Sequence, residues 1–528
     1  MMIWHIFKKD LKLQWPFVLG LALADAINAT LQGMLGHFPN FNVLQPVFFL
    51  NGFITVATFL LVVAVVQLDP VPEDRQDWLV RPIRRWDLLL SKLLFVVVCI
   101  HGPLFAANFY QGLASGLSSG QALDAALSWN AYDFVKIGMT GPPRFPGTLA
   151  ALAIGAATRS VGQALALGMV GGVGGLLVAG GLRRAIYGDF FGGLNQSGGL
   201  AQWILALFVV LVGAAVVLSL QYFHRATRSA WIVICVGLFL VWSSLMLMPP
   251  ALALATQSAF SSAPGRGVSI SFVPEARKHQ FSATSRYASL AAQGFTPVYL
   301  PLNITGISPD LNLVAEGVHA TFTAADGARA ESDPDVLSLP VHVPGQADAP
   351  TPLYQVFGVP DDFYSSHSDQ PIRIDVDITF GILRPSGRYE LPPVRGAITT
   401  PEGVSCETRQ FPNRGITLGC IKPGNLPIRV SADLVDHASG LGNPVFTQFM
   451  PGDAPYAGGL TNVITQFGFT LPFRSTETGS AYPVTAAQIA SSSVVLMTSK
   501  PLTHVMRSVT IPNLKLSEWT AEFTGAGH

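Results

Sequence analysis

The sequence predicts a polytopic α-helical membrane domain of six to seven spans, residues 1–250, followed by an all-β extracytoplasmic region of one or two β-sandwich domains. Three observations predict this fold class. Of the 528 residues, 49% are hydrophobic and only 12% are charged, about half the charged fraction of an ordinary soluble domain. Long apolar runs recur up to residue 250. Short β-branched or alternating segments recur after residue 268.

A membrane-spanning helix needs about 20 mostly apolar residues to cross about 30 Å of hydrocarbon. Six runs of that length stand out, at Trp15–Gly36, Pro46–Leu68, Leu88–Tyr110, Val161–Leu182, Gln202–Leu220 and Ala230–Met248. Residues 133–157 form a weaker fourth span, interrupted by glycine and prolines, which brings the expected number to seven. The first run is longer than the apolar core of a signal peptide, so we take it as an uncleaved span in the lipid bilayer.

Positive charge sets the expected orientation, because Lys and Arg in short loops stay on the cytoplasmic side. Seven spans place inside the basic residues Lys8, Lys9, Lys12, Arg75, Arg81, Arg84, Arg85, Lys92, Arg159, Arg225 and Arg228. Arg183 and Arg184 face outward and go against the rule. The expected location is therefore the cell (inner) membrane, with a cytoplasmic N-terminus and everything after residue 250 extracytoplasmic.

The second half of the chain is expected to begin with a linker, because residues 251–267 are rich in Ala, Ser and Gly. Strand signals over 268–528 lie at Val268–Val273, Val298–Ile304, Val318–Phe322, Leu353–Val359, Ile372–Leu383, Ile428–Val435, Thr461–Thr470, Val494–Thr498 and Val505–Ile511. Turn residues such as Asp326-Gly327 and Pro385-Ser386-Gly387 separate them. This pattern favours antiparallel sandwiches, with a domain boundary near 390–400 if there are two.

The four cysteines agree with this organisation. Cys99 and Cys235 fall inside predicted spans, where a thiol behaves as a small apolar side chain. Cys406 and Cys420 lie in the β region, separated by 14 positions with Asn413-Arg414-Gly415 between them. That spacing suits a hairpin, so we expect a disulfide in an oxidising compartment, the alternative being two unpaired thiols.

Motifs for catalysis are missing from the sequence. It contains no phosphate-binding Gly-x-x-x-x-Gly-Lys-Ser/Thr loop, no His-Glu-x-x-His and no Cys-x-x-Cys pair, and its histidines lack metal-ligand spacing. The Gly-x-Ser-x-Gly string at 116–120 follows a predicted span, so we interpret it as chance. Residues 1–250 hold 15 basic and 10 acidic residues, the remainder 17 and 22, with no strong basic tract. We therefore expect no enzyme, no metal or cofactor, and no nucleic-acid partner.

The most informative segment is the loop at 69–92, between the second and third predicted spans. It has acidic residues where the second span ends, then Arg-Pro-Ile-x-Arg at 81–85 and Leu-Leu-x-Ser-Lys at 88–92. This loop resembles that of permease subunits of ATP-binding-cassette (ABC) transporters of the exporter type, the ABC-2 class. In that family it is the main cytosolic contact with a separate ATPase subunit. The resemblance implies docking by Asp74, Arg75, Trp78, Arg81, Pro82, Arg84, Arg85 and Lys92. The alternative is that the basic residues only anchor the spans.

Other features extend the resemblance over residues 1–230. The segment Trp4–Trp15 resembles the family's interfacial helix. Ala157-Thr158-Arg159-Ser160, followed by Gly-Gln-Ala-Leu-Ala at 162–166, resembles the family's cytoplasmic turn after the fourth span, and the same four residues recur at 226–229. The family commonly has six spans and a cytoplasmic C-terminus, so the seventh span and the outer β region depart from it.

Polar residues and glycines within the predicted spans are further candidates. Asp25 and Asn28 lie mid-span, three positions apart, and either line a substrate path or bond to a neighbouring helix. The spacings Gly168/Gly172 and Gly171/Gly175 permit close helix packing, within the chain or between subunits.

The leading hypothesis is a permease subunit, present as a homodimer or with a paired permease. A separate cytoplasmic ABC ATPase subunit would hold the ATP and Mg²⁺, and the β region would meet an extracytoplasmic substrate or partner. The alternative is a membrane-anchored extracytoplasmic binding or assembly protein that transports nothing.

Overall fold

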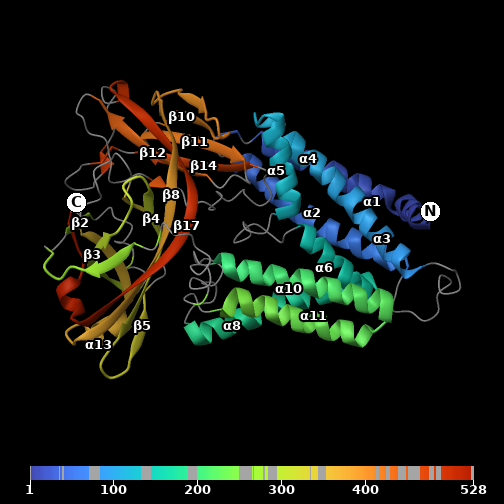
Figure 1. Ribbon diagram of the computed structural model, residues 1–528, viewed down its shortest axis with the longest axis horizontal. Helices are drawn as coiled ribbons and strands as arrows, with labels where there is room; N and C mark the ends of the chain where they lie inside the picture. The colour runs from blue at the N-terminus through green and yellow to red at the C-terminus, as the bar shows by residue number, and fades with distance from the viewer. Residues whose placement is uncertain are drawn as a thin grey trace.

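Two unlike regions make up the chain, a bundle of helices and a set of β-sheets at one end of it (Figure 1). The computed structural model describes residues 2–34, 36–37, 41–69, 84–132, 144–187, 199–248, 252, 265, 267–276, 280–282, 290, 294–332, 335–342, 352–411, 415–423, 428–437, 448–449, 464–471, 473–474, 481–482 and 489–524.

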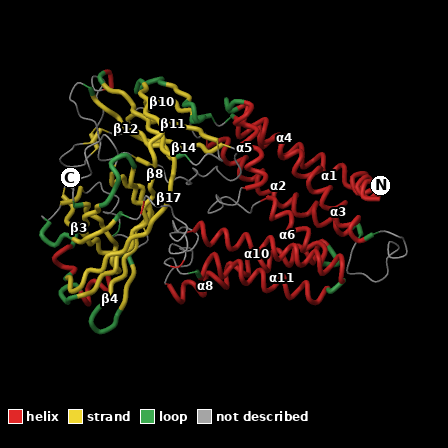
Figure 2. Tube along the Cα trace, in the orientation of Figure 1, coloured by secondary structure: helices red, strands yellow, loops and turns green. Residues whose placement is uncertain are grey.

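Long helices that run side by side form the bundle (Figure 2). They are α1 (Met2–Gly33), α2 (Phe41–Gln67), α3 (Arg85–Phe95), η2 (Val96–His101), α4 (Gly102–Ala114), α5 (Ser119–Tyr132), α6 (Arg144–Ala157), α7 (Val161–Met169), η3 (Val170–Gly174), α8 (Gly175–Tyr187), α10 (Gly199–Ser219), η4 (Leu220–His224), α11 (Thr227–Trp242) and η5 (Ser243–Leu247). The η segments are π-helical turns that continue the preceding helix, so α3–η2–α4 and α7–η3–α8 are each one long rod.

Five of these rods are long and apolar enough to cross a membrane, among the described residues. They cover Phe49–Gln67, Arg85–Ala114, Val161–Ala185, Ile204–His224 and Thr227–Leu247, matching five of the six clear spans predicted above. The expected first span lies in α1, a 32-residue helix that continues the N-terminal segment without a break but does not reach the same apolarity. The weak fourth span corresponds to α6, whose apolar part is short, Gly147–Ala157.

The two ends of the bundle differ in charge. The start of α1, the end of α2, the start of α3, the α6–α7 turn and the η4–α11 turn gather at one end, which we call the basic pole. Hydrogen bonds tie these ends together, from Gln67 to the hydroxyl of Thr158 and from Trp231 to the carbonyl of Ala157, each 3.1 Å. The opposite ends face the β-sheets and form the β pole (Figure 1).

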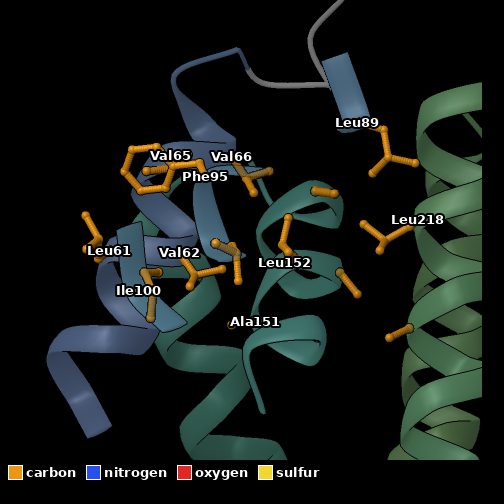
Figure 3. Packing of buried hydrophobic residues seen from close by; sticks show 14 of the residues in the cluster. Leu61, Val62, Val65, Val66, Leu89, Phe95, Ile100, Ala151, Leu152 and Leu218 are labelled. Atoms are coloured by element: carbon orange, nitrogen blue, oxygen red, sulfur yellow. The ribbon is translucent and has the colours of Figure 1, made fainter. Parts of the chain in front are cut away.

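Close-packed apolar side chains from α2, α3, η2, α6 and α10 form the core of the bundle (Figure 3). Val62, Phe95 and Leu152 are each fully buried there. Gly155 lets α6 approach α2 closely, because a Cβ at this position would lie 3.2 Å from the Cα of Val63. The short helix α6 is thus held in the centre of the bundle.

Reciprocal caps begin two of the helices. At α7, Ser160 accepts a hydrogen bond from the backbone of Gln163, whose side chain accepts one from the backbone of Arg159. Ser118 and Gln121 form a similar pair at the start of α5, so the Gly-x-Ser-x-Gly string joins two helices and caps one of them. The repeated Ala-Thr-Arg-Ser differs at its second copy, where α11 begins at Thr227 after Arg225 in a left-handed conformation.

In the β region, the central element is a seven-stranded sheet. The strands of all the sheets in this region are β1 (Ser269–Phe272), β2 (Gln280–Ser282), β3 (Phe295–Thr305), β4 (Asn312–Thr323), β5 (Arg329–Glu331), β6 (Asp335–His342), β7 (Leu353–Pro360), β8 (Ile372–Leu391), β9 (Ala397–Thr399), β10 (Ser405–Phe411), β11 (Gly415–Pro423), β12 (Arg429–Asp436), β13 (Gln448–Phe449), β14 (Ile464–Leu471), β15 (Phe473–Arg474), β16 (Ala481–Tyr482), β17 (Ser492–Leu514) and β18 (Glu522–Thr524). The central sheet has the order β13-β12-β17-β8-β4-β5, with β6 paired to β4.

Two smaller sheets cover this central sheet. The sheet β1-β3-β7 shares one apolar core with β4 and with the first half of β8. The sheet β14-β11-β10-β9 shares a second core with β12 and with the first part of β17. Since β8 and β17 pair along almost their whole length, they belong to both halves, and chain segments on either side of 390–400 share one sheet.

Prolines inside the long strands explain where the strand prediction was wrong. Pro385-Ser386-Gly387 was expected to be a turn, but it lies within β8 opposite Thr498 and Ser499 of β17. The two predicted strands Val494–Thr498 and Val505–Ile511 are likewise one strand, β17. Register shifts occur beside Pro385 and Pro501, and such bulges accommodate a residue that cannot donate a ladder hydrogen bond. The predicted Asp326-Gly327 turn is confirmed, with Gly327 at a φ of 89°.

The predicted disulfide is confirmed. Cys406 of β10 and Cys420 of β11 are directly paired across the two strands and joined by a disulfide, and both are buried in the second core. Of the other two cysteines, Cys99 is buried in the bundle and Cys235 is exposed on α11.

The bundle meets the β region at its β pole. Ala125 of α5 packs against Ile421 and Ile464 of the sheet that carries the disulfide. The turn at Gly403 approaches the start of α5 so closely that a Cβ there would lie 2.7 Å from the amide nitrogen of Gln121. Beyond the end of α1, His37 bonds to the hydroxyl of Ser405 at 2.9 Å, and its other ring nitrogen lies 3.6 Å from Glu407.

We predict that the disulfide stabilises the β region by about 3 kcal/mol, the amount expected for cross-linking two positions 14 residues apart. A reducing agent, or the double variant Cys406→Ala/Cys420→Ala, should lower the unfolding midpoint of the full chain in detergent micelles. Cys235→Ala is the matched control and should behave as wild type. Equal midpoints under reducing and oxidising conditions would contradict the prediction.

The contact at His37 should weaken in acid. Burial lowers the pKa of His37 and outweighs the opposite effect of Glu407. The unfolded chain then binds this proton more readily than the folded chain, so stability falls as pH drops below the ordinary histidine value of about 6.5. Between about pH 7.5 and 5.5, wild type should lose more of its thermal midpoint than His37→Gln. A loss of the same size in both proteins would rule this out.

Candidate functional site

A buried cluster of charges at the basic pole joins the ends of three helices. The ammonium of Lys92, in α3, lies 2.8 Å from a carboxylate oxygen of Asp10 in α1 and 2.8 Å from one of Asp69, just beyond the end of α2. Lys9 adds a second ammonium, 2.7 Å from Asp69 and 3.6 Å from Asp10. Two carboxylates and two ammonium groups therefore neutralise each other, and we call these four residues the charge cluster.

Because the charge cluster is largely buried, each of its charges needs its partner in place. The side chains of Lys92 and Asp10 are completely inaccessible, whereas those of Asp69 and Lys9 are 14% and 44% exposed. Removing one partner from such a pair leaves the other as an uncompensated buried charge. Burial by itself would raise the pKa of Asp69, but the ammonium groups of Lys92 and Lys9 outweigh it and hold that pKa below its usual value. All three helices must therefore be in place together.

The charge cluster brackets the segment that the sequence singled out for docking. Asp69 is the last described residue after α2, which ends at Gln67, and α3 begins at Arg85. Of the expected docking residues, Asp74, Arg75, Trp78, Arg81 and Pro82 lie outside the described residues. Both flanks of that segment are thus fixed to each other and to α1 through Lys92.

The described docking candidates divide into two kinds. Arg84 and Arg85 are exposed at the start of α3, and Arg85 donates a hydrogen bond to the carbonyl of Phe223 in η4. The ring of Trp86 packs at a tilt against that of Phe223, with ring centroids 4.4 Å apart. Lys92 was expected at the docking surface, but its ammonium is buried and paired with the carboxylates of Asp10 and Asp69. It therefore holds α3 to the residues that precede the segment.

Deeper in the bundle, Asp25 and Asn28 are both buried in α1. Asn28 donates to the side chain of Asn51 in α2 at 2.8 Å and accepts from Gln32 at 3.1 Å. Gln32 in turn accepts from Gln111 of α4 at 2.8 Å. This amide ladder joins α1, α2 and α4, and satisfies polar groups that hydrocarbon could not.

The glycines of α7–η3–α8 are split between two environments. Gly171 and Gly175 pack within the chain against α11, where a Cβ would lie 2.7 Å from Leu238 and 2.2 Å from Trp242. Trp242 also donates to the carbonyl of Gly171 at 2.7 Å. By contrast, a Cβ at Gly172 would meet nothing within 4 Å, and one at Gly168 would make only ordinary contact with Phe59.

The exception to the charge rule has a structural role. Arg183 is buried at the β pole and donates to the carbonyl of Met246 at 2.8 Å, which satisfies a backbone acceptor where η5 ends. Arg184 beside it is exposed. Positive charge at this end is therefore used partly for helix capping.

Sequence reasoning missed Asp10 and Asp69 as site residues. Asp10 lies in the segment before the first predicted apolar run, and Asp69 directly follows the second. The available signal was an acidic residue at the end of one span and a basic residue, Lys92, one helical turn inside the next. Asp10, the other carboxylate that pairs with Lys92, could be found only from the packing of α1.

No known protein family matches the chain, and no curated protein matches it at a significant level. In the part of the chain that the structure describes, no group of three or more His, Cys, Asp or Glu side chains is placed to hold a metal ion. The charge cluster is therefore the candidate functional site on its own geometry.

We predict that Lys92→Met destabilises the protein by about 3–5 kcal/mol, because Asp10 is left buried without its counter-ion. The double variant Lys92→Met/Asp10→Asn should recover a large part of this loss, since it removes the stranded charge. The control is Lys8→Met, at an exposed lysine whose ammonium lies over the ring of Trp4. Denaturant titration in detergent micelles, followed by tryptophan fluorescence, measures all four proteins. A double variant no more stable than Lys92→Met would refute the pairing.

Proposed function

We propose that the chain is the permease subunit of an ATP-driven ABC transporter of the exporter type, and that its 70–83 segment with Arg84 and Arg85 docks a separate ATPase subunit. The observation that carries the proposal is the charge cluster. It fixes both flanks of the segment to α1, so a displacement of the segment moves three helices together.

The charge distribution supports the orientation that this function needs. Arg84, Arg85, Arg159 and Arg228, with the lysines of α1, lie at the basic pole, and the β-sheets lie at the other end. Under the positive-inside rule the basic pole is cytoplasmic and the β region extracytoplasmic, in the cell (inner) membrane. Seven membrane spans, with α1 and the short α6 counted among them, place every one of these basic turns on the cytoplasmic side.

The chemistry of the reaction belongs to the partner. The sequence has no phosphate-binding loop, so the partner subunit would hold ATP and Mg²⁺, and this chain would convert nucleotide-driven motion into helix movement. Two permeases, identical or paired, would enclose the substrate route. The β region would receive the substrate or contact an extracytoplasmic partner.

The test is co-purification. We expect that full-length protein isolated from its native membrane in mild detergent carries a stoichiometric ATPase subunit and hydrolyses ATP. Replacing Arg81, Arg84 and Arg85 with Ala should leave membrane insertion intact and reduce the retained ATPase at least about tenfold, since docking arginines each contribute on the order of 1 kcal/mol or more. Arg159→Ala/Arg228→Ala removes cations from other turns of the same pole and should retain the partner.

Two outcomes would overturn the proposal. If the triple variant retains the ATPase as wild type does, the segment is not the docking site. If wild type reproducibly carries no nucleotide-binding subunit, the chain is better described as a membrane-anchored extracytoplasmic binding or assembly protein.

A further inference from the structure

An apolar groove opens between α3, α6 and α10 near the basic pole. It has a volume of about 320 Å³, and its walls are Leu89 and Leu93 of α3, Leu149 of α6, and one face of α10 and η4. Leu89 and Leu218 point toward one another across it (Figure 3). This volume is at the lower end of those that hold small ligands, about 300–1,000 Å³, so it suits one slender apolar chain.

The shape of the groove comes from small residues on α10. Its lining there falls at positions 211, 214, 215, 218, 219 and 223, which form a single helical face. Ala214, Ala215 and Ser219 leave the hollow that the leucines of α3 and α6 do not fill. From 211 to 223 the face is about 18 Å long, close to the depth of one hydrocarbon leaflet, about 15 Å.

The mouth of the groove is aromatic and basic. Trp86 is 59% exposed and packs at a tilt against Phe223, so an amphipathic ring lies where the groove reaches the pole. Arg84 and Arg85 are exposed beside it, and Arg228 follows Phe223 by five positions. Asp87 in the same turn is half-buried, so the exposed charge at the mouth is positive. Guanidinium groups at this level suit a phosphate.

We propose that this groove binds one acyl chain of an anionic phospholipid, whose phosphate lies at Arg84 and Arg85. The occupant follows from the combination of a one-leaflet apolar groove and a cationic mouth, which matches a lipid with a net negative headgroup. The inference requires only that the bundle lies in a bilayer, so it does not depend on an ATPase partner. The lipid is a bound ligand of the bundle, separate from any transported substrate.

The experiment is native mass spectrometry of the full chain in mild detergent, titrated with phosphatidylglycerol or phosphatidylcholine of identical acyl chains. Wild type should retain one phosphatidylglycerol about tenfold more tightly than phosphatidylcholine. Arg84→Gln/Arg85→Gln should abolish this preference, and Ala215→Trp, which fills the groove, should remove the tight site for both lipids. Val178→Trp adds the same side chain to an exposed position of α8 and should bind as wild type.

Equal affinity for the two lipids in wild type would overturn the proposal, because annular lipid binds without headgroup preference. Unchanged binding by a correctly folded Ala215→Trp would also overturn it. Should Ala215→Trp fail to fold, the arginine variant decides, since both arginines are exposed: an intact preference for phosphatidylglycerol in that variant refutes the site.

Discussion

The arrangement of the bundle depends on one buried ammonium group. Lys92 is fully buried and bridges Asp10 and Asp69, so α1, α2 and α3 are held at a single point. A buried charge is tolerated only when its partners are present, and each of these partners comes from a different helix. The segment 70–83 begins one residue after Asp69 and ends just before α3. The two described flanks of this segment, Asp69 and α3, are therefore both held to α1.

Toward the β pole, hydrogen bonds join the helices. The amide ladder through Asn28, Asn51, Gln32 and Gln111 links the same α1 and α2 to α4, and Arg183 satisfies a carbonyl at the end of η5. In hydrocarbon each of these polar groups needs a protein partner. From α4 the chain turns through the Ser118 cap into α5, which packs on the disulfide-bearing sheet. A continuous set of contacts thus connects the charge cluster to the β region.

Apolar runs predicted the bundle well. Five long helices are apolar over about 20 residues, and this property can be read from each segment without knowing how the helices pack. The spacing of Cys406 and Cys420 likewise predicted their pairing. The strands of the β region were harder, because Pro385 and Pro501 usually end a strand, and only pairing between β8 and β17 shows that bulges accommodate them. The charge cluster escaped prediction for the same reason. Lys92 and Asp10 are 82 positions apart, and their contact depends on how α1 packs.

The proposed function requires that the segment 70–83, which the charge cluster flanks, docks a cytoplasmic ATPase subunit. The most direct measurement is a photo-reactive amino acid placed at Trp78, in the middle of that segment, and irradiated in native membranes. We expect a cross-link to a polypeptide that carries a phosphate-binding loop, and none from the same group at the exposed position Val178 of α8. Cross-links from position 78 only to lipid, or only to other residues of this chain, would contradict it.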